Sequence, residues 1–286
     1  MKINTRIRSI FKNIFRITLR KILFYKANKF LKQNEPVFGG LFDYISFEII
    51  LDEYYEKSEL DKLLEWISRY EENTGRFYFN KVIDVGANIG NHSRYFAKYF
   101  KNVIAIEAHP LTFKILEVNT AEFDNITLIN LGVCDQESIM YMDKLGSNIG
   151  GIKLDKLKKN YTVKCNTLDN ILKDESDIGL IKIDVEGFEY EVVRGAKSLL
   201  KNNSPIICFE QQKSDIELGT TKTIELLKEL GYYNFLQYTK KYDLENKNDI
   251  TKLILTIKII LFGNSYKLEK INKLNNKYHP LIIAYK

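Results

Sequence analysis

Short apolar runs alternate with segments of helical spacing through the middle of the chain. Five runs are rich in β-branched residues and predict buried strands: Val82–Val85, Val103–Ile106, Ile126–Leu131, Leu180–Ile183 and Ile206–Phe209. Between these runs, apolar residues recur at the spacing that is typical of amphipathic helices. The alternation predicts a Rossmann-like α/β fold with a mostly parallel central sheet and helices on both faces.

The flanking segments follow other patterns. Helical spacing over about residues 44–70, with a capping-box sequence at Ser58–Asp61, predicts a helical N-terminal extension. Further strands are expected at Ile139–Met142, Tyr161–Cys165, Tyr232–Tyr238, Leu253–Phe262 and Leu281–Tyr285. We therefore divide the chain into an extension, residues 1–75, and an α/β domain, residues 76–286.

The turn after the first predicted strand indicates a nucleoside cofactor. Asp84 lies near the end of that strand, and Gly86, Ala87, Asn88 and Gly90 follow before the next helical segment. Glycines let the backbone approach a ligand closely, and a helix N-terminus offers free amide groups. The alternative is an ordinary turn between a strand and a helix.

The spacing of the glycines selects among cofactors. Asn88 takes the place of the middle glycine of the G-x-G-x-x-G dinucleotide fingerprint, and no Lys-Ser or Lys-Thr pair follows Gly90. Cofactors that bind through phosphates are therefore disfavoured. Glu107 closes the next predicted strand, where a carboxylate can accept hydrogen bonds from ribose hydroxyls. S-adenosylmethionine, which has a ribose and no phosphate, fits these residues.

Two residues beyond this turn have open roles. His109 is a candidate general base or a neighbour of the adenosine, and a capping or surface role is the alternative. Asp135 follows the third predicted strand, where the amino group of adenine can be recognised. Its alternative is also helix capping.

A second acidic cluster follows the strand Leu180–Ile183. Asp184, Glu186 and Glu189 surround Gly187, at the sheet edge where the cofactor crevice is expected. A carboxylate there can act as general base toward a methyl acceptor, orient sugar hydroxyls or hold a divalent ion. A solvated acidic turn that caps the following helix is the alternative. We assign no metal site.

Composition indicates a soluble globular protein. The 286 residues are 45% hydrophobic and 28% charged, and no run of eighteen apolar residues predicts a membrane-spanning helix. Cys134, Cys165 and Cys208 have neither the spacing of metal ligands nor that of a disulfide framework, which favours a reducing cytoplasm.

The charge is concentrated at the N-terminus. Residues 1–34 contain ten Lys/Arg and no acid, so a net charge of +6 leaves 6 − 10 = −4 for the remainder. Apolar residues recur at helical spacing in the same arm, which suits peripheral contact with an anionic membrane surface. A helix that packs on the domain and exposes its lysines is an equal alternative. The arm can also contact a polyanionic substrate or another subunit. We expect no nucleic-acid partner.

Several motifs together resemble the FkbM-type methyltransferases. They are Asp84-Val-Gly-Ala-Asn-Ile-Gly90, Glu107-Ala-His-Pro110, Thr167-Leu-Asp169, Lys182-Ile-Asp-Val-Glu-Gly-Phe-Glu189 and Arg194-Gly-Ala196. The resemblance covers about residues 80–240, and Ala108 departs from the proline expected at its position. It implies a class I, S-adenosylmethionine-dependent fold and methylation of hydroxyl groups of sugars or polyketides.

The resemblance also implies roles for individual residues. The cofactor would be surrounded by Asp84, Gly86, Asn88, Gly90 and Glu107, with Asp135 near the adenine. The methyl acceptor would be faced by Asp184 and Glu186. The segments outside the resemblance would select the substrate.

The expected function is therefore O-methylation of a sugar hydroxyl, free, nucleotide-linked or within a bacterial surface polysaccharide. The expected location is the cytoplasm, with a peripheral position at the inner face of the membrane if the basic arm binds lipid. One alternative is a nicotinamide dehydrogenase, which would share Asp84 and Glu107 but lacks its phosphate-binding glycines. Another is a membrane-recruited binding module without catalysis. The oligomeric state is left open.

Overall fold

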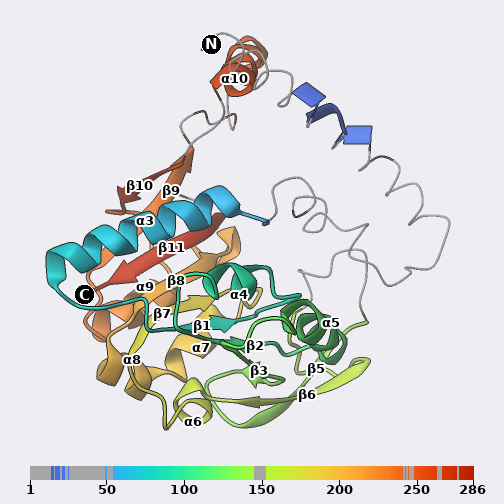
Figure 1. The fold of residues 1–286 in the computed structure, drawn as a ribbon, viewed down its shortest axis with the longest axis vertical. Helices are drawn as coiled ribbons and strands as arrows, with labels where there is room; N and C mark the ends of the chain where they lie inside the picture. Colours follow the sequence, from blue (N-terminus) through green and yellow to red (C-terminus); the bar gives the residue numbers. More distant parts are fainter. Residues whose placement is uncertain are drawn as a thin grey trace. The chain divides into compact units, whose positions relative to one another are not determined.

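A computed structural model describes the chain over residues 54–144, 153–240, 248–262, 266–275 and 277–286, with single residues and runs of two or three elsewhere (Figure 1). Most of the basic arm, the start of the helical segment predicted from residue 44, and the loop 145–152 lie outside the described residues. Two compact units are present. One comprises residues 1–64 and 239–268, and the other comprises residues 65–238 and 269–286.

An eight-stranded sheet has the order β10-β9-β11-β8-β7-β1-β2-β3. Its strands are β1 (Lys81–Val85), β2 (Asn102–Ile106), β3 (Ile126–Ile129), β7 (Ile178–Ile183), β8 (Ile206–Gln211), β9 (Asn234–Lys240), β10 (Tyr266–Lys270) and β11 (His279–Tyr285). Neighbours from β3 to β8 pair in parallel, and β11 is antiparallel to both β8 and β9. The predicted Rossmann-like, mostly parallel sheet is confirmed.

The central strands are buried along their whole length. Every residue of β7 and β8 is buried, as expected for parallel strands covered by helices on both faces. Part of each strand (Ile178, Ile181 and Ile183 of β7, and Ile207 and Phe209 of β8) belongs to one hydrophobic core with Ile83, Val192 and Leu227. The β-branched runs in the sequence therefore mark the centre of the fold.

Helices lie before and between the strands. They are α3 (Lys57–Thr74), α4 (Asn91–Phe96), α5 (Pro110–Thr120), α6 (Leu168–Ile171), α7 (Glu189–Arg194), α8 (Lys197–Asn203), α9 (Lys222–Glu229) and α10 (Asp249–Phe262), with a 3-10 turn, η1 (Lys213–Asp215). The crossovers from β1 to β2 and from β7 to β8 run in opposite directions along the sheet. Right-handed connections then place α4 and α7 on opposite faces (Figure 1).

The three strands between β3 and β7 in the sequence form a second, smaller sheet. It consists of β4 (Gly132–Val133), β5 (Ser138–Met142) and β6 (Tyr161–Asn166) in the order β4-β6-β5. The short strands predicted at 139–142 and 161–165 are confirmed. The three cysteines are free and buried.

The strand predicted at Leu253–Phe262 is wrong, because these residues form most of the helix α10. Isoleucine-rich composition favoured a strand, but Ile250, Ile254 and Ile257 recur at helical spacing and stay exposed, so no sheet buries them. Within the described part of the chain, no helix is long and apolar enough to cross a membrane.

The segment between β7 and β8 contains two helices, α7 and α8. They are separated at Gly195 and Ala196. A Cβ at Gly195 would lie 2.2 Å from the carbonyl oxygen of Cys134, so the chain passes too close to that backbone for a larger residue.

Candidate active site

Four acidic side chains meet at the carboxyl edge of the main sheet. Asp84 and Glu210 lie near the ends of β1 and β8, whereas Glu107 and Asp184 directly follow β2 and β7. The strand order β8-β7-β1-β2 makes these four ends neighbours. The crossovers change direction between β1 and β7, and ligands of open α/β sheets bind at such a switch point.

The glycine turn after β1 is held against both neighbouring strands. Gly86 has φ of 77°, and a Cβ there would lie 1.8 Å from the carbonyl oxygen of Asp184. The amides of Gly86 and Ala87 both donate to the carbonyl of Ile106, at 2.9 and 3.0 Å. Only glycine fits at position 86, because the turn contacts the end of β7 while it is bonded to β2.

Asn88 and Gly90 complete this turn in left-handed conformations. Their φ angles are 51° and 89°, and a Cβ on Gly90 would lie 2.7 Å from Cδ1 of Leu116. The Asn88 amide N–H donates to Glu107 Oε2 at 2.9 Å. Its side-chain oxygen is buried and has no hydrogen-bond partner in the described structure. A buried acceptor of this kind fits a ligand that brings its own donor, such as a hydroxyl or an amine.

Glu107 is fixed by two backbone amides. Its Oε1 accepts from His109 N–H at 2.8 Å, and its Oε2 accepts from Asn88 N–H. Burial raises the pKa of Glu107 to about 7, although both hydrogen bonds favour the carboxylate. Each oxygen retains acceptor capacity, so the side chain fits a role in binding ribose hydroxyls.

Sequence reasoning missed Lys182, which lies on β7 at the centre of the site. Its side chain is 5% exposed, and Nζ lies 3.1 Å from Asp84 Oδ1 and 3.3 Å from Asp184 Oδ2. It also donates to the Gly86 carbonyl at 3.2 Å. Burial opposes the charge, but the two carboxylates outweigh it and raise the pKa of Lys182 above its ordinary range. A lysine inside an apolar run signals such a pair, because buried charges require partners.

Asp84 contacts other parts of the protein rather than the crevice. Its side chain is fully buried, and Oδ2 accepts a 2.6 Å hydrogen bond from the Ser93 hydroxyl on α4. With Lys182 on the other oxygen, Asp84 joins β1 to α4 and β7. This geometry favours a positioning role for Asp84.

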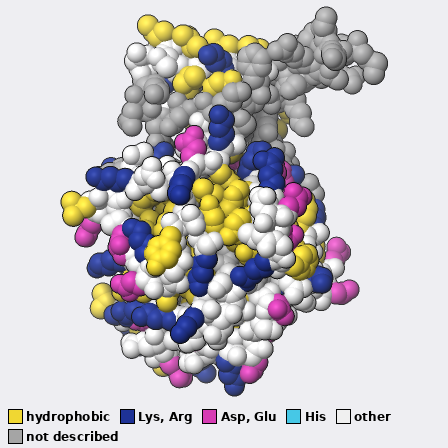
Figure 2. All heavy atoms as spheres, turned by 90° about the vertical axis from the view of Figure 1, so that its left-hand side faces the viewer, with side chains coloured by type: hydrophobic (Ala, Val, Ile, Leu, Met, Phe, Trp, Pro, Cys, Tyr) yellow, Lys and Arg dark blue, Asp and Glu magenta, His cyan; other side chains and the backbone are white. Residues whose placement is uncertain are grey.

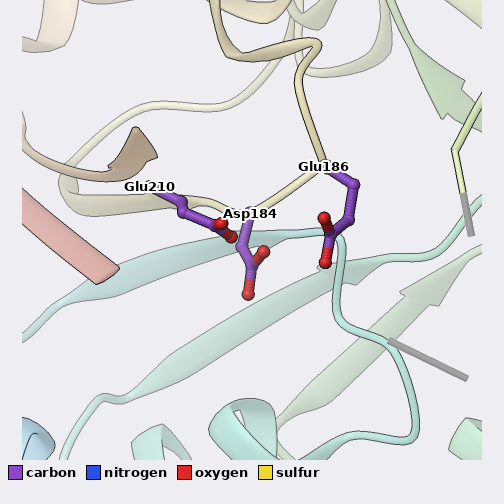
Figure 3. Close-up of side chains that lie close together, drawn as sticks. All are labelled: Asp184, Glu186 and Glu210. Atoms are coloured by element: carbon purple, nitrogen blue, oxygen red, sulfur yellow. The ribbon is translucent and has the colours of Figure 1, made fainter. Parts of the chain in front are cut away.

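The carboxyl groups of Asp184, Glu186 and Glu210 converge within 4.8 Å of one another (Figure 3). Burial favours the neutral form of Asp184, but the charge of Lys182 outweighs it and lowers the pKa. Burial, reinforced by the charge of Asp184, raises the pKa of Glu210 to about 10. The same two causes raise the pKa of Glu186. At neutral pH the cluster therefore contains an ionised Asp184 beside a protonated Glu210.

Glu189 belongs to the scaffold of this cluster. It is buried, and Oε1 accepts from the amides of Val185 and Gly187 at 3.3 and 3.1 Å. Burial raises the pKa of Glu189 to about 7. Glu189 therefore holds the turn before α7 by its backbone amides, and it does not cap the helix. Glu186 has φ of 55°, a conformation that turns the chain back toward α7.

His109 is the N-cap of α5. Nδ1 accepts from the amides of Leu111 and Thr112 at 3.2 and 3.4 Å, and Nε2 lies 3.0 Å from the carbonyl oxygen of Asp143. The side chain is buried, and this burial lowers the pKa of the imidazole. Both ring nitrogens have protein partners, so this geometry favours the capping alternative over the general-base role.

Asp135 forms an ion pair with Arg194 at the end of α7. Both side chains line a cavity of about 350 Å³, together with Met140 and Phe188. The role of Asp135 near the adenine stays a prediction. The sequence did not indicate that Arg194 would hold this carboxylate.

The strand order, the glycine turn and the acid after β2 define a class I methyltransferase that depends on S-adenosylmethionine. The family model described as the methyltransferase FkbM domain matches residues 84–236, more than half of the chain. The protein belongs to the FkbM methyltransferase family, and its cofactor is S-adenosylmethionine.

Solved structures of several methyltransferases are similar over most of the chain. Methyltransferase FkbM from Methylobacillus flagellatus KT is 14% identical over 91% of this chain and 58% of its own, with a TM-score of 0.41. A SAM-dependent O-methyltransferase from Thermotoga maritima is 12% identical over 86% and 72%, with a TM-score of 0.41. Precorrin-6y C5,15-methyltransferase from Geobacter metallireducens GS-15 is 14% identical over 82% and 95%, also with 0.41. The comparison with curated proteins finds no match.

Proposed function

We propose that the protein transfers the methyl group of S-adenosylmethionine to a hydroxyl of a sugar or glycan, such as a polysaccharide or its nucleotide-sugar precursor. The observation that carries this proposal is the cluster of Asp184, Glu186 and Glu210 beside Lys182. Three carboxyl groups within 4.8 Å present several hydrogen-bond acceptors, which suits an acceptor with neighbouring hydroxyls.

In the proposed reaction, S-adenosylmethionine supplies the methyl group. Glu107 and the Asn88 side chain bind the ribose hydroxyls, and Asp135 recognises the adenine. Asp184 would hydrogen-bond the acceptor hydroxyl and take its proton as the oxygen bonds to the methyl carbon and the bond from that carbon to the sulfonium sulfur breaks, with S-adenosylhomocysteine as the leaving group. The Asp184 side chain is 36% exposed, so a substrate can reach it.

The neighbours of Asp184 have supporting roles. Lys182 keeps Asp184 ionised and oriented, and Asp84 holds Lys182 in turn. Glu186 accepts a hydrogen bond from a second hydroxyl. His109 positions Glu107 through its backbone amide. Lys182 supplies positive charge at this cluster, so we assign no metal to it.

The decisive variant is Asp184→Asn, which keeps the shape of the side chain but cannot accept a proton. We expect the dissociation constant for S-adenosylmethionine to stay within about twofold, while turnover falls at least about 100-fold. Calorimetry and a labelled-methyl assay with a panel of nucleotide sugars measure the two quantities. Asp124→Asn, at an exposed position before β3, is the matched control and should change neither. Normal turnover in Asp184→Asn would remove the base role.

The two alternatives from the sequence are weaker. Membership in a methyltransferase family disfavours the dehydrogenase. A binding module without catalysis would not need an ionised Asp184 next to a protonated Glu210. If the wild-type chain transfers methyl groups faster than Asp184→Asn does, the protein is an enzyme and not such a module.

We further propose a cytoplasmic enzyme that touches the membrane through residues 1–34. The described arm residues Ile14, Phe15 and Ile22 are helical, with exposed fractions of 45%, 67% and 48%. Flotation of the chain on anionic vesicles, with and without residues 1–34, tests the arm. Recovery should fall on deletion, because the arm carries ten cations and no acid. Equal recovery would reject this contact.

A further inference from the structure

The helix α10 presents an apolar stripe to solvent. Its exposed members have exposed fractions of 73% for Ile250, 63% for Leu253, 49% for Ile254, 47% for Ile257 and 37% for Leu261. Their spacing of three and four residues places them on one face of the helix. Figure 2 shows hydrophobic side chains gathered along this helix, at the top of the view.

The charges on α10 itself are mostly positive. Asp249 is its first residue, and the charged residues that follow, Lys252 and Lys258, are both exposed. Beyond its first residue, the exposed surface of the helix therefore combines apolar and cationic side chains, which is complementary to an anionic surface.

We propose that α10 is an interfacial helix that binds the surface of an anionic lipid bilayer. Its apolar stripe enters the boundary between headgroups and acyl chains, and Lys258, next to the stripe, pairs with lipid phosphates. The helix has 14 residues and two lysines, so it lies on the bilayer rather than crossing it. This contact is separate from the basic arm and from the methyl-transfer site.

A second copy of the chain fits the stripe less well. At about 1.5 Å of rise per residue, the stripe is roughly 20 Å long, and with a helix width of about 10 Å it covers about 200 Å². A stable interface needs about 800 Å² from each partner. The lysines of two facing α10 helices would also repel one another, whereas an anionic bilayer attracts them.

The test is flotation of the full chain with vesicles of phosphatidylcholine and phosphatidylglycerol. The triple variant Leu253→Ser, Ile254→Ser, Ile257→Ser should lower the partition coefficient at least about tenfold, because it removes the apolar stripe. The matched control is the triple variant Val118→Ser, Leu157→Ser, Tyr233→Ser. It changes side chains of the other unit that are 77%, 72% and 72% exposed, and it should stay within about twofold of the wild type.

A second variant keeps the stripe and reverses the charge. Lys252→Glu with Lys258→Glu should weaken binding to the anionic vesicles, and the difference from the wild type should shrink at high salt. On vesicles of phosphatidylcholine alone, both proteins should bind equally. Circular dichroism checks that α10 stays helical in both variants.

Three results would overturn the proposal: a wild-type chain that does not float, a triple variant that floats like the wild type, or a charge reversal without effect. Light scattering tests the other occupant, since a dimer that the stripe substitutions convert to monomer would assign the stripe to a second copy. Vesicle binding is measured without a methyl acceptor, so failure here leaves the methyl-transfer proposal standing.

Discussion

Replacement of Lys182 by methionine tests the electrostatic centre of the site. The substitution keeps an unbranched chain in the buried position but leaves Asp84 and Asp184 without the cation that lies 3.1 and 3.3 Å away. At an effective dielectric constant of about 20, each contact contributes about 5 kcal/mol of attraction before the desolvation cost. Removal of one partner from a buried ion pair costs about 3–5 kcal/mol, so we expect a loss of that size.

Urea unfolding measures this loss, with Lys81→Met as the matched control. Lys81 lies at the other end of β1. Its ion pair with Glu175 joins side chains that are 17% and 36% exposed, whereas Lys182 and Asp84 are 5% and 0% exposed, so the loss of Lys81 should cost about 1 kcal/mol or less. Adding Asp184→Asn to Lys182→Met should recover part of the stability, because it removes an unpaired buried charge. A loss in Lys182→Met no larger than in Lys81→Met would refute the reasoning.

The pH dependence of the same loss follows from the pKa shifts. Asp184 has a lowered pKa in the folded protein, so its contribution is present above the ordinary value of about 3.9 and is lost as pH falls. Lys182 has a raised pKa, so its contribution is complete below about 10.4 and is lost only at higher pH. In Lys182→Met, burial without the cation raises the pKa of Asp184, so the cost should be smaller at low pH, where that carboxyl is protonated, and larger at neutral pH.

Two further predictions concern the cofactor crevice. Gly86→Ala should unfold the turn or abolish cofactor binding in a thermal-shift assay. The control is Gly75→Ala, which is also at positive φ but would have nothing within 4 Å of its Cβ, and it should cost about 1–2 kcal/mol of stability. Equal losses of stability in the two variants would contradict the close approach at Gly86. Glu107→Gln should weaken cofactor binding about tenfold or more by calorimetry. In the wild type without cofactor, the free energy of unfolding should fall as pH rises from 4.5 to 7, because folded Glu107 keeps a proton that the unfolded chain releases. The rise in the pKa of Glu107 corresponds to about 3 kcal/mol, and Glu107→Gln should remove this fall. If the free energy of unfolding of Glu107→Gln falls with pH as steeply as that of the wild type, Glu107 is not the group with the raised pKa.

The sheet was predictable because its strands are buried on both faces. Uninterrupted apolar runs such as Ile206–Phe209 favour the centre of an α/β domain, where helices cover both faces of the strand. The same cue failed for α10, because a run of isoleucines identifies apolar surface but not the partner that covers it. Gly195 was also uninformative from sequence alone. The reason for its break between α7 and α8 is a contact with Cys134, 61 positions earlier in the chain.

The site was predictable where chemistry is local and less so where it depends on packing. The glycine turn and Glu107 follow from strand ends, and the structure brings them into hydrogen-bond contact. Which acids are ionised could not be deduced, because the answer depends on Lys182 and on burial across three strands. The role of His109 could not be deduced either, since a histidine before a proline at a helix start serves as a cap as readily as a catalyst.

The most direct measurement is mass spectrometry of an acceptor incubated with the enzyme and S-adenosylmethionine carrying an isotopically labelled methyl group. Our account predicts one labelled methyl on a sugar oxygen with the wild-type chain, and none above background with Asp184→Asn. A chain that binds the cofactor but places the label on nitrogen or carbon, or on oxygen equally well without Asp184, would contradict it.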